Sequence, residues 1–282
     1  TNASCYSVPM QLRFTKMHGL GNDFIVFEAD AHTLPTAAQL RALADRRTGI
    51  GFDQALVIQP PQQANTDLFY RIFNADGSEV EQCGNGARCV ASLVAQQRGK
   101  ALLHMDCPGG LVNAELLANG QVAVDMGVPQ FEPAALPFIA AARAKRYAIE
   151  AAGHTVEIGA VSMGNPHAVL VVPDIGTAPV ATLGPALEHH ARFPQRVNVG
   201  FMHIISRNEI NLRVFERGAG ETQACGTGAC AAVAVGRTLG LLDETVNVHL
   251  PGGTLVIRWP GEDSHLWMTG PAVTVYTGQI DL

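Results

Sequence analysis

The sequence lacks long apolar stretches and carries little charge of either sign. Its longest uninterrupted apolar run, residues 229–235, is far shorter than the ~18 residues that a membrane helix needs. Charged residues make up 16% of the 282 residues, and the formal net charge is −6. A nucleic-acid-binding protein usually presents a basic face, whereas the two basic clusters here, residues 46–47 and 143–146, are typical of solvated surface. We therefore expect neither a membrane nor a nucleic-acid partner.

The start of the chain lacks the basic and apolar segments of a signal peptide. Residues 1–9 are polar and irregular, and Met10 resembles a natural start, so we interpret these nine residues as an extension or a cloning remnant. Hydrophobic residues make up 47% of the chain, enough for a substantial core. We expect a cytoplasmic protein whose cysteines are reduced. The six cysteines are Cys5, Cys83, Cys89, Cys107, Cys225 and Cys230.

Motifs for metals and cofactors are also missing. Structural zinc favours cysteines separated by about two to four residues, whereas Cys83 and Cys89 are too far apart and Cys225 and Cys230 lie at the edge of this range. A pyridoxal enzyme needs a Schiff-base lysine, and none of the three lysines lies in a glycine-rich segment. We therefore expect no metal site and no cofactor.

Two matching segments are the most informative feature of the chain. Residues 71–87 and 213–229 lie 142 positions apart, share 7 of 17 residues, and contain Cys83 and Cys225 in a shared Cys-Gly-x-Gly-Ala sequence. Such a repeat indicates one structural unit used twice. Two equivalent thiols can act on one substrate from opposite sides, which a reaction that inverts a carbon centre requires.

The duplication extends beyond the cysteines. Residues 108–112 match residues 251–256, and residues 21–26 match residues 164–169, both one position off the central offset. We interpret the chain as two copies, about residues 10–128 and 144–271, with the proline-rich residues 129–142 as the crossover. Residues 272–282 alternate like a strand that returns to the first half. The predicted domains are therefore residues 10–128 with 272–282, and residues 129–271.

Each half is predicted to place strands before the cysteine motif and a helix after it. Residues 67–73 and 209–215 resemble strands. Residues 87–97 and 229–235 are made largely of small and apolar residues on all sides, so helices there must be enclosed. The sequence thus predicts an α+β fold of two pseudo-symmetric domains, each a curved, mostly antiparallel sheet wrapped around a buried central helix that begins near its cysteine.

A cysteine at the start of a helix is a candidate reactive group, because the helix N-terminus favours its thiolate form. A free thiol with a pKa of ~8.5 is only a few per cent thiolate at neutral pH, and a helix N-terminus lowers that pKa by roughly one unit. The flanking glycines allow the backbone N–H groups to approach a bound carboxylate. Cys83 and Cys225 are therefore candidate reactive thiols, whereas the other four cysteines are more typical of small buried hydrophobes.

Four motifs closely resemble the diaminopimelate epimerase family, over nearly the whole chain from Met10. They are Met-His-Gly-Leu-Gly-Asn-Asp-Phe at residues 17–24 and the segments at residues 74–89, 164–167 and 216–230. The resemblance implies a cofactor-independent epimerase that interconverts LL- and meso-2,6-diaminopimelate in the synthesis of lysine and cell-wall precursors. It also implies a site between two domains, closure on substrate and, as one option, a homodimer.

The resemblance assigns roles by motif. Cys83 and Cys225 are the expected acid and base, while His167 and Glu216 are expected to tune their pKa values. The expected substrate-binding residues are Asn22, Gln54, Asn74, Gly84, Asn85, Asn165, Asn198, Glu216, Arg217, Gly226 and Thr227.

Two alternatives remain open at this point. One is another thiol-based racemase of the same fold, acting on proline or hydroxyproline, although the polar residues around Arg217 argue against a substrate with no second polar end. The other is a thiol redox or ligand-binding protein that uses Cys83 and Cys225 as a switch. Such a protein would not exchange the α-hydrogen of an amino acid in deuterated water.

Overall fold

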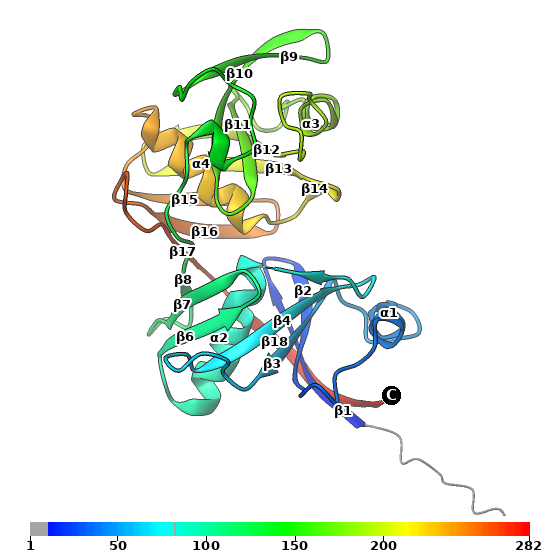
Figure 1. Ribbon diagram of the computed structural model, residues 1–282. Helices are drawn as coiled ribbons and strands as arrows, with labels where there is room; N and C mark the ends of the chain where they lie inside the picture. The colour runs from blue at the N-terminus through cyan, green and yellow to red at the C-terminus, as the bar shows by residue number, and fades with distance from the viewer. Residues whose placement is uncertain (1–10, 82) are drawn as a thin grey trace, which may run out of the picture. The chain divides into compact units, whose positions relative to one another are not determined.

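Figure 1 shows a computed structural model of the protein, which describes residues 11–81 and 83–282. Residues 1–9, interpreted above as an extension or a cloning remnant, lie outside the described residues. The chain divides into two compact units. The first ends at Leu116 and also contains Ala272–Leu282, and the second is Leu117–Pro271. Across the described residues, no helix combines the length and the hydrophobicity that crossing a membrane requires.

The described residues of the first unit form two helices and eight strands. They are β1 (Gln11–Gly19), β2 (Asn22–Glu28), α1 (Ala37–Ala44), β3 (Gln54–Gln59), β4 (Leu68–Asn74), β5 (Glu79–Val80), α2 (Gly84–Arg98), β6 (Leu102–Cys107), β7 (Gly110–Leu116) and β18 (Val273–Asp281).

The second unit contains two helices, a short 3₁₀ helix and ten strands. They are β8 (Val122–Asp125), η1 (Pro133–Ala135), β9 (Tyr147–Ala151), β10 (His154–Ser162), β11 (Pro166–Val171), α3 (Val180–Glu188), β12 (Asn198–Ser206), β13 (Glu209–Glu216), β14 (Gly220–Thr222), α4 (Gly226–Thr238), β15 (Thr245–Leu250), β16 (Gly253–Arg258) and β17 (Trp267–Gly270).

The two units repeat one pairing scheme. In the first, β1 pairs antiparallel with β2 and β18, β2 runs parallel to β3, and β4 pairs antiparallel with β3 and parallel with β6. In the second, β10 pairs antiparallel with β11 and β9, β11 runs parallel to β12, and β13 pairs antiparallel with β12 and parallel with β15. The predicted fold class, a mostly antiparallel sheet in each of two duplicated units, is confirmed.

Each central sheet is buried on both faces. In the first unit, Leu56 of β3 faces α2, because a Cβ placed on Gly86 would lie 2.9 Å from Leu56 Cδ2. Its neighbours Ala55 and Val57 point the other way and pack in one core with Leu40 of α1. Residues 55–58 are therefore apolar throughout, as a strand enclosed between two helices must be.

The second unit repeats this layering. A Cβ on Gly228 of α4 would lie 2.9 Å from Val214 Cγ2 of β13, and Leu183 and Leu187 of α3 share the other core with Phe201 of β12. Figure 1 shows α4 lying along the strands of its own unit. All residues of α4 from position 228 to 236 are buried, so the predicted enclosure of this apolar helix is confirmed.

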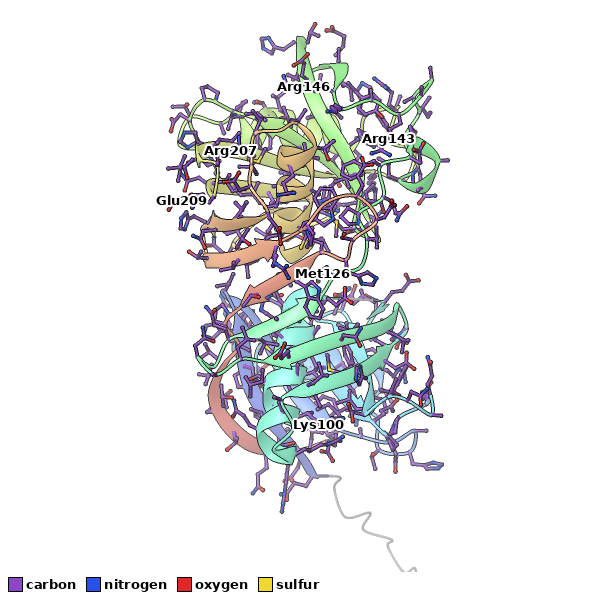
Figure 2. All side chains as sticks on the ribbon, turned by 90° about the vertical axis from the view of Figure 1, so that its left-hand side faces the viewer. Lys100, Met126, Arg143, Arg146, Arg207 and Glu209 are labelled. Carbon is purple, nitrogen blue, oxygen red and sulfur yellow. The ribbon has the colours of Figure 1, made fainter. Side chains whose placement is uncertain are left out.

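The connection between the units lies earlier in the chain than we predicted. β8 pairs antiparallel with β17, and Met126, labelled in Figure 2, donates its backbone N–H to Leu266 O at 2.8 Å. Residues 117–128 thus belong to the second unit, whereas the sequence analysis assigned them to the first half. The predicted return of residues 272–282 is confirmed, because β18 pairs with β1 along its length.

Candidate active site

Cys83 and Cys225 occupy the same structural position in their units. Each is the N-cap residue of a central helix, with Cys83 before α2 and Cys225 before α4. Both have extended backbone angles, and their carbonyl oxygens accept the first helical bonds, from Ala87 N at 2.8 Å and from Ala229 N at 3.0 Å. The N–H groups of the first helical turn, which have no partner within the helix, therefore follow each cysteine directly in the chain. The predicted position of each cysteine at a helix start is confirmed.

In the first unit, two amide side chains lie beside the Cys83 thiol. Asn22 Oδ1 is 3.9 Å from Cys83 Sγ and accepts a hydrogen bond from Asn85 Nδ2 at 3.3 Å. Asn85 is buried and its Oδ1 accepts from the fully buried Arg88 at 3.0 Å. These contacts bring Asn22, Cys83 and Asn85 together, with Gly84 buried between the cysteine and Asn85.

Gln54 and Asn74 form a second amide pair in this unit. They lie opposite each other on β3 and β4, and Gln54 Nε2 donates to Asn74 Oδ1 at 3.0 Å. Gln54 is also opposite Phe24 of β2, two residues beyond Asn22. The neighbouring ends of β2, β3 and β4 therefore carry Asn22, Gln54 and Asn74, which were predicted from separate motifs.

In the second unit, Cys225 is enclosed and surrounded by polar groups. Its sulfur accepts a hydrogen bond from Gly228 N at 3.3 Å and lies 3.7 Å from Thr227 Oγ1. A Cβ on Gly228 would come within 3.2 Å of the same sulfur, so the glycine permits this close approach. Burial and the negative charge of Glu216 raise the pKa of Cys225 well above its ordinary value, against the smaller opposite effect of Thr227 and Gly228. The thiol form is therefore favoured here.

Glu216 lies at the end of β13 and is largely enclosed. Burial raises the pKa of its carboxyl, while hydrogen bonds with Thr222 and Cys225 lower it in part. Thr222 Oγ1 donates to Glu216 Oε1. The carboxylate thus accepts from Thr222, and its charge in turn favours the protonated sulfur of Cys225.

His167 is a neutral group in this structure. Burial and the nearby Arg217 charge lower its pKa to about 3. Its Nε2 lies 2.9 Å from Asn165 Oδ1, and Asn165 Nδ2 donates to Thr227 Oγ1 at 3.3 Å. A chain of polar contacts therefore runs from His167 through Asn165 to Thr227 beside the sulfur of Cys225.

The turn after β13 presents Arg217. Asn198 Oδ1 accepts from Arg217 N at 2.9 Å, and the buried Glu188 of α3 accepts from Gly218 N at 2.8 Å. The guanidinium itself donates to Gln195 O at 3.0 Å, which leaves other N–H groups of its planar fork for a ligand. The second unit thus brings together Asn165, His167, Asn198, Glu216, Arg217, Cys225, Gly226 and Thr227.

Sequence reasoning missed several charged residues that support these groups. Asp53 accepts from Asn22 Nδ2 at 3.0 Å, Arg46 contacts Asp53 and Asp23, and Glu188 holds the Arg217 turn. Asp23 and Asp53 adjoin the predicted residues Asn22 and Gln54 in the sequence. That adjacency was the available signal, but the pairing of β2 with β3 is needed to see that they meet.

The other described cysteines are buried, as predicted. Cys89, Cys107 and Cys230 are at most 3% exposed, and burial raises the pKa of Cys89 to about 12. Cys5 lies outside the described residues. Within residues 11–81 and 83–282, no group of three or more His, Cys, Asp or Glu side chains could hold a metal ion.

Known proteins resemble this chain along most of its length. A family model described as diaminopimelate epimerase matches residues 14–132 and 159–275. The diaminopimelate epimerase of Pseudomonas syringae pv. tomato is 55% identical over 278 residues, covering 97% of this chain and all of that protein. The diaminopimelate epimerase of Chromobacterium violaceum is 56% identical over 276 residues with the same coverage.

More distant solved structures share the fold. A hydroxyproline epimerase from Agrobacterium vitis superposes with a TM-score of 0.68 at 15% identity, covering 96% of this chain and 93% of that one. A PhzF-family phenazine biosynthesis protein from Bacillus anthracis gives a TM-score of 0.65 at 16% identity, covering 97% and 100%. At such identities the likeness concerns the fold alone.

Proposed function

Because the chain belongs to the diaminopimelate epimerase family, we propose that it interconverts LL- and meso-2,6-diaminopimelate by proton transfer between two cysteines. The chain is an amino-acid epimerase, and we place its reaction in the synthesis of lysine and cell-wall precursors. We propose that the reaction needs no pyridoxal phosphate, because the side chains supply the acid and the base. A homodimer stays a prediction.

The observation that carries this proposal is the equivalence of Cys83 and Cys225. Both are N-cap residues of enclosed helices in duplicated units. In the proposed reaction one sulfur, as thiolate, takes the α-proton from one face of the carbon, and the other, as thiol, gives its proton to the opposite face. The configuration inverts, and the two sulfurs exchange protonation states. Turnover in the reverse direction exchanges their roles.

The surroundings of Cys225 suit the proton-donating role in the substrate-free protein. Burial and the Glu216 charge keep this thiol protonated, and the neutral His167 adds no positive charge that would favour the thiolate. Cys83 would then be the base for the substrate isomer whose α-hydrogen faces it. Product formation leaves Cys225 as the thiolate, where Gly228 N is already placed as a donor at 3.3 Å.

Acid–base catalysis alone does not account for the removal of an α-proton. It contributes about 10²–10⁴-fold, whereas the α-hydrogen of an amino acid is a very weak acid. We propose that the remaining stabilisation comes from backbone N–H groups around Gly84, Asn85, Gly226 and Thr227, which would bind the α-carboxylate as negative charge develops on it.

The far end of the substrate is a second amino-acid group. We propose that Arg217 binds its carboxylate with the free part of the guanidinium fork, since Asn198 and Glu188 hold the Arg217 turn in place. Asn22, Gln54, Asn74 and Asn165 would complete the polar set around the substrate. A proline substrate has no such second polar end.

The test is a deuterium-exchange assay with an amino-acid panel. The unaltered chain should invert diaminopimelate in deuterated water with deuterium at the α-carbon of the product, and proline should not react. Cys83→Ala and Cys225→Ala should each lower inversion by about a hundredfold or more. Cys107→Ala, which removes a buried thiol outside the site, is the matched control and should retain activity. Full turnover in Cys225→Ala would rule out the two-base reaction.

A further inference from the structure

A compact charged cluster contacts the Asn22 side chain in the first unit. Its members are Lys16, Asp23, Arg46 and Asp53. Arg46 donates through Nη1 and Nη2 to both carboxylate oxygens of Asp23, at 2.9 and 2.7 Å, and through Nη2 to Asp53 Oδ1 at 2.8 Å. Lys16 also contacts Asp23. Although burial alone raises the pKa of Asp23, the bonds from Arg46 and Lys16 hold it far below its ordinary value. The ionised form of Asp23 is therefore strongly favoured.

Asp53 connects this cluster to Asn22. Its Oδ2 accepts from Asn22 Nδ2 at 3.0 Å and from Asp23 N at 3.1 Å, while its Oδ1 faces Arg46. The backbone of Asp53 is fixed as well, because its N–H donates to the Asp23 carbonyl at 3.0 Å. The carboxylate is thus held from two sides, with one oxygen directed at the Asn22 amide.

This contact selects one of the two orientations of the Asn22 side-chain amide. With Nδ2 on Asp53, the carbonyl Oδ1 points to Asn85 Nδ2 and Cys83 Sγ. Rotating the amide by half a turn would place its oxygen against a carboxylate and its NH₂ against the NH₂ of Asn85. Because a hydrogen bond to an ionised acceptor is about twice as strong as a neutral one, the observed orientation is strongly preferred.

We propose that Asp53, held by Arg46, is a positioning residue of the epimerase, which fixes the Asn22 amide so that its carbonyl oxygen faces Cys83. The inference rests on the proposed role of Cys83 as an acid and base. In that role the sulfur must donate or accept a proton along one direction. An Asn22 amide free to rotate would offer the sulfur either a donor or an acceptor and would disturb this alignment.

A plain surface ion pair would behave differently from a positioning residue. The side chains of Asp53 and Arg46 are 46% and 57% exposed, and exposed ion pairs contribute little to folding. Loss of Asp53 should therefore leave the melting temperature nearly unchanged while catalysis falls. This contrast separates the proposal from a role in stability.

The experiment compares Asp53→Ala with Asp67→Ala. Asp67 is a matched control, because it too accepts from a backbone N–H, that of His104 at 2.9 Å, and pairs with a cation, Lys100. Lys100, labelled in Figure 2, follows the end of α2 opposite Cys83. We expect Asp53→Ala to lower kcat by about ten- to a hundredfold with a smaller change in KM. Asp67→Ala should change kcat by about twofold at most.

A double-mutant cycle with Asn22→Ala gives the decisive readout. If Asp53 acts through Asn22, adding Asp53→Ala to the Asn22→Ala protein should lower kcat by less than about twofold further. A full additional loss in that background, or an Asp53→Ala enzyme with unchanged kcat, would overturn the proposal. Should Asp53→Ala melt at a lower temperature, Asp53→Asn, which keeps the shape and one acceptor, takes its place in the cycle.

The two proposals fail in different ways. If the unaltered chain does not invert diaminopimelate, the proposed function fails before any variant is compared. If the unaltered chain inverts it and Asp53→Ala keeps its kcat, only the positioning role of Asp53 fails.

Discussion

Cys83 and Cys225 are alike in sequence but differ in their surroundings. Cys225 is only 4% exposed and lies beside Glu216 of β13, whereas Cys83 is half-buried with Asn22 Oδ1 of β2 beside its sulfur. A duplicated motif therefore does not give identical surroundings. The difference comes from residues on other strands, which the shared Cys-Gly-x-Gly-Ala sequence does not contain.

Replacing Glu216 with glutamine should lower the pKa of the Cys225 thiol. Burial raises that pKa most, and the charge of Glu216 is the second cause, so the neutral amide removes the second cause and leaves the first. The thiolate then forms at a lower pH. Labelling of Cys225 by iodoacetamide, followed by peptide mass spectrometry in a Cys83→Ser background, should rise at lower pH in Glu216→Gln than in the parent.

The predicted fall in the pKa of the Cys225 thiol requires Glu216 to be ionised in the parent protein. Its own pKa is raised by burial, so the two proteins should label alike at acidic pH and diverge once the carboxyl has lost its proton. Glu221→Gln is the matched control, because Glu221 lies on β14 of the same unit but pairs with Arg213. A labelling curve that moves to higher pH, or moves equally in Glu221→Gln, would contradict the assigned cause.

At the residue scale, the sequence motifs marked the proposed substrate-binding residues but not the charged residues that contact them. Asn22, Gln54 and Asn74 stand in specific motifs, and the structure brings them to neighbouring strand ends. Asp53 and Arg46 carry no such mark. The parallel pairing of β2 with β3 brings Asp53 to Asn22 and Asp23, about 30 positions earlier in the chain. The turn after α1 brings Arg46 to the same place.

At the scale of elements, glycine decides how closely the central helix approaches its sheet. A Cβ on Gly159 of β10 would lie 2.3 Å from Val235 Cγ1 of α4, far inside contact distance. By contrast, a Cβ on Gly200 of β12 would find its nearest atom, on Leu212, at 3.6 Å. The small residues of the helix predicted that it is enclosed. The sequence did not show which glycine of the neighbouring strands packs against it.

Replacing Gly159 with alanine should destabilise the second unit. The added methyl group forces Val235 or the helix to move, and overpacking of this kind lowers the free energy of unfolding by about 1–3 kcal/mol. Gly200→Ala is the matched strand control and should change it by less than about 0.5 kcal/mol. Thermal unfolding followed by circular dichroism compares the two. Equal melting temperatures would show that α4 is less tightly packed on β10 than the structure indicates.

At the scale of the whole molecule, the duplication and the return of the last strand were predictable from the sequence, but the pairing of β8 with the second unit was not. Matched blocks at nearly constant offset revealed two copies, and the pairing schemes of the two units agree with them. However, β8 lies at the end of the first copy in sequence and pairs with β17 in the second unit. Similarity between the two halves of the sequence shows which segments are equivalent. The strand with which each segment pairs depends instead on which sheet has a free edge for it.

The return of β18 makes the first unit depend on the C-terminal residues of the chain. β18 pairs with β1, the ring of Phe14 lies against Gly278, and Ile280 packs on the core that contains Leu12. Removing residues 272–282 should therefore expose β1 and weaken the first unit. The second unit, which has β9 in the equivalent place, should stay folded.

Hydrogen exchange measured on peptides tests this dependence on the truncated chain. Peptides from β1 and β2 should lose protection, while those from β10 and β12 should keep it, because local stability follows local contacts. A synthetic peptide of residues 272–282, added in excess, should restore protection to β1 by occupying the vacated edge, and a scrambled peptide should not. Equal loss in both units would instead show that the units unfold as one, so that β18 does more than complete the first sheet.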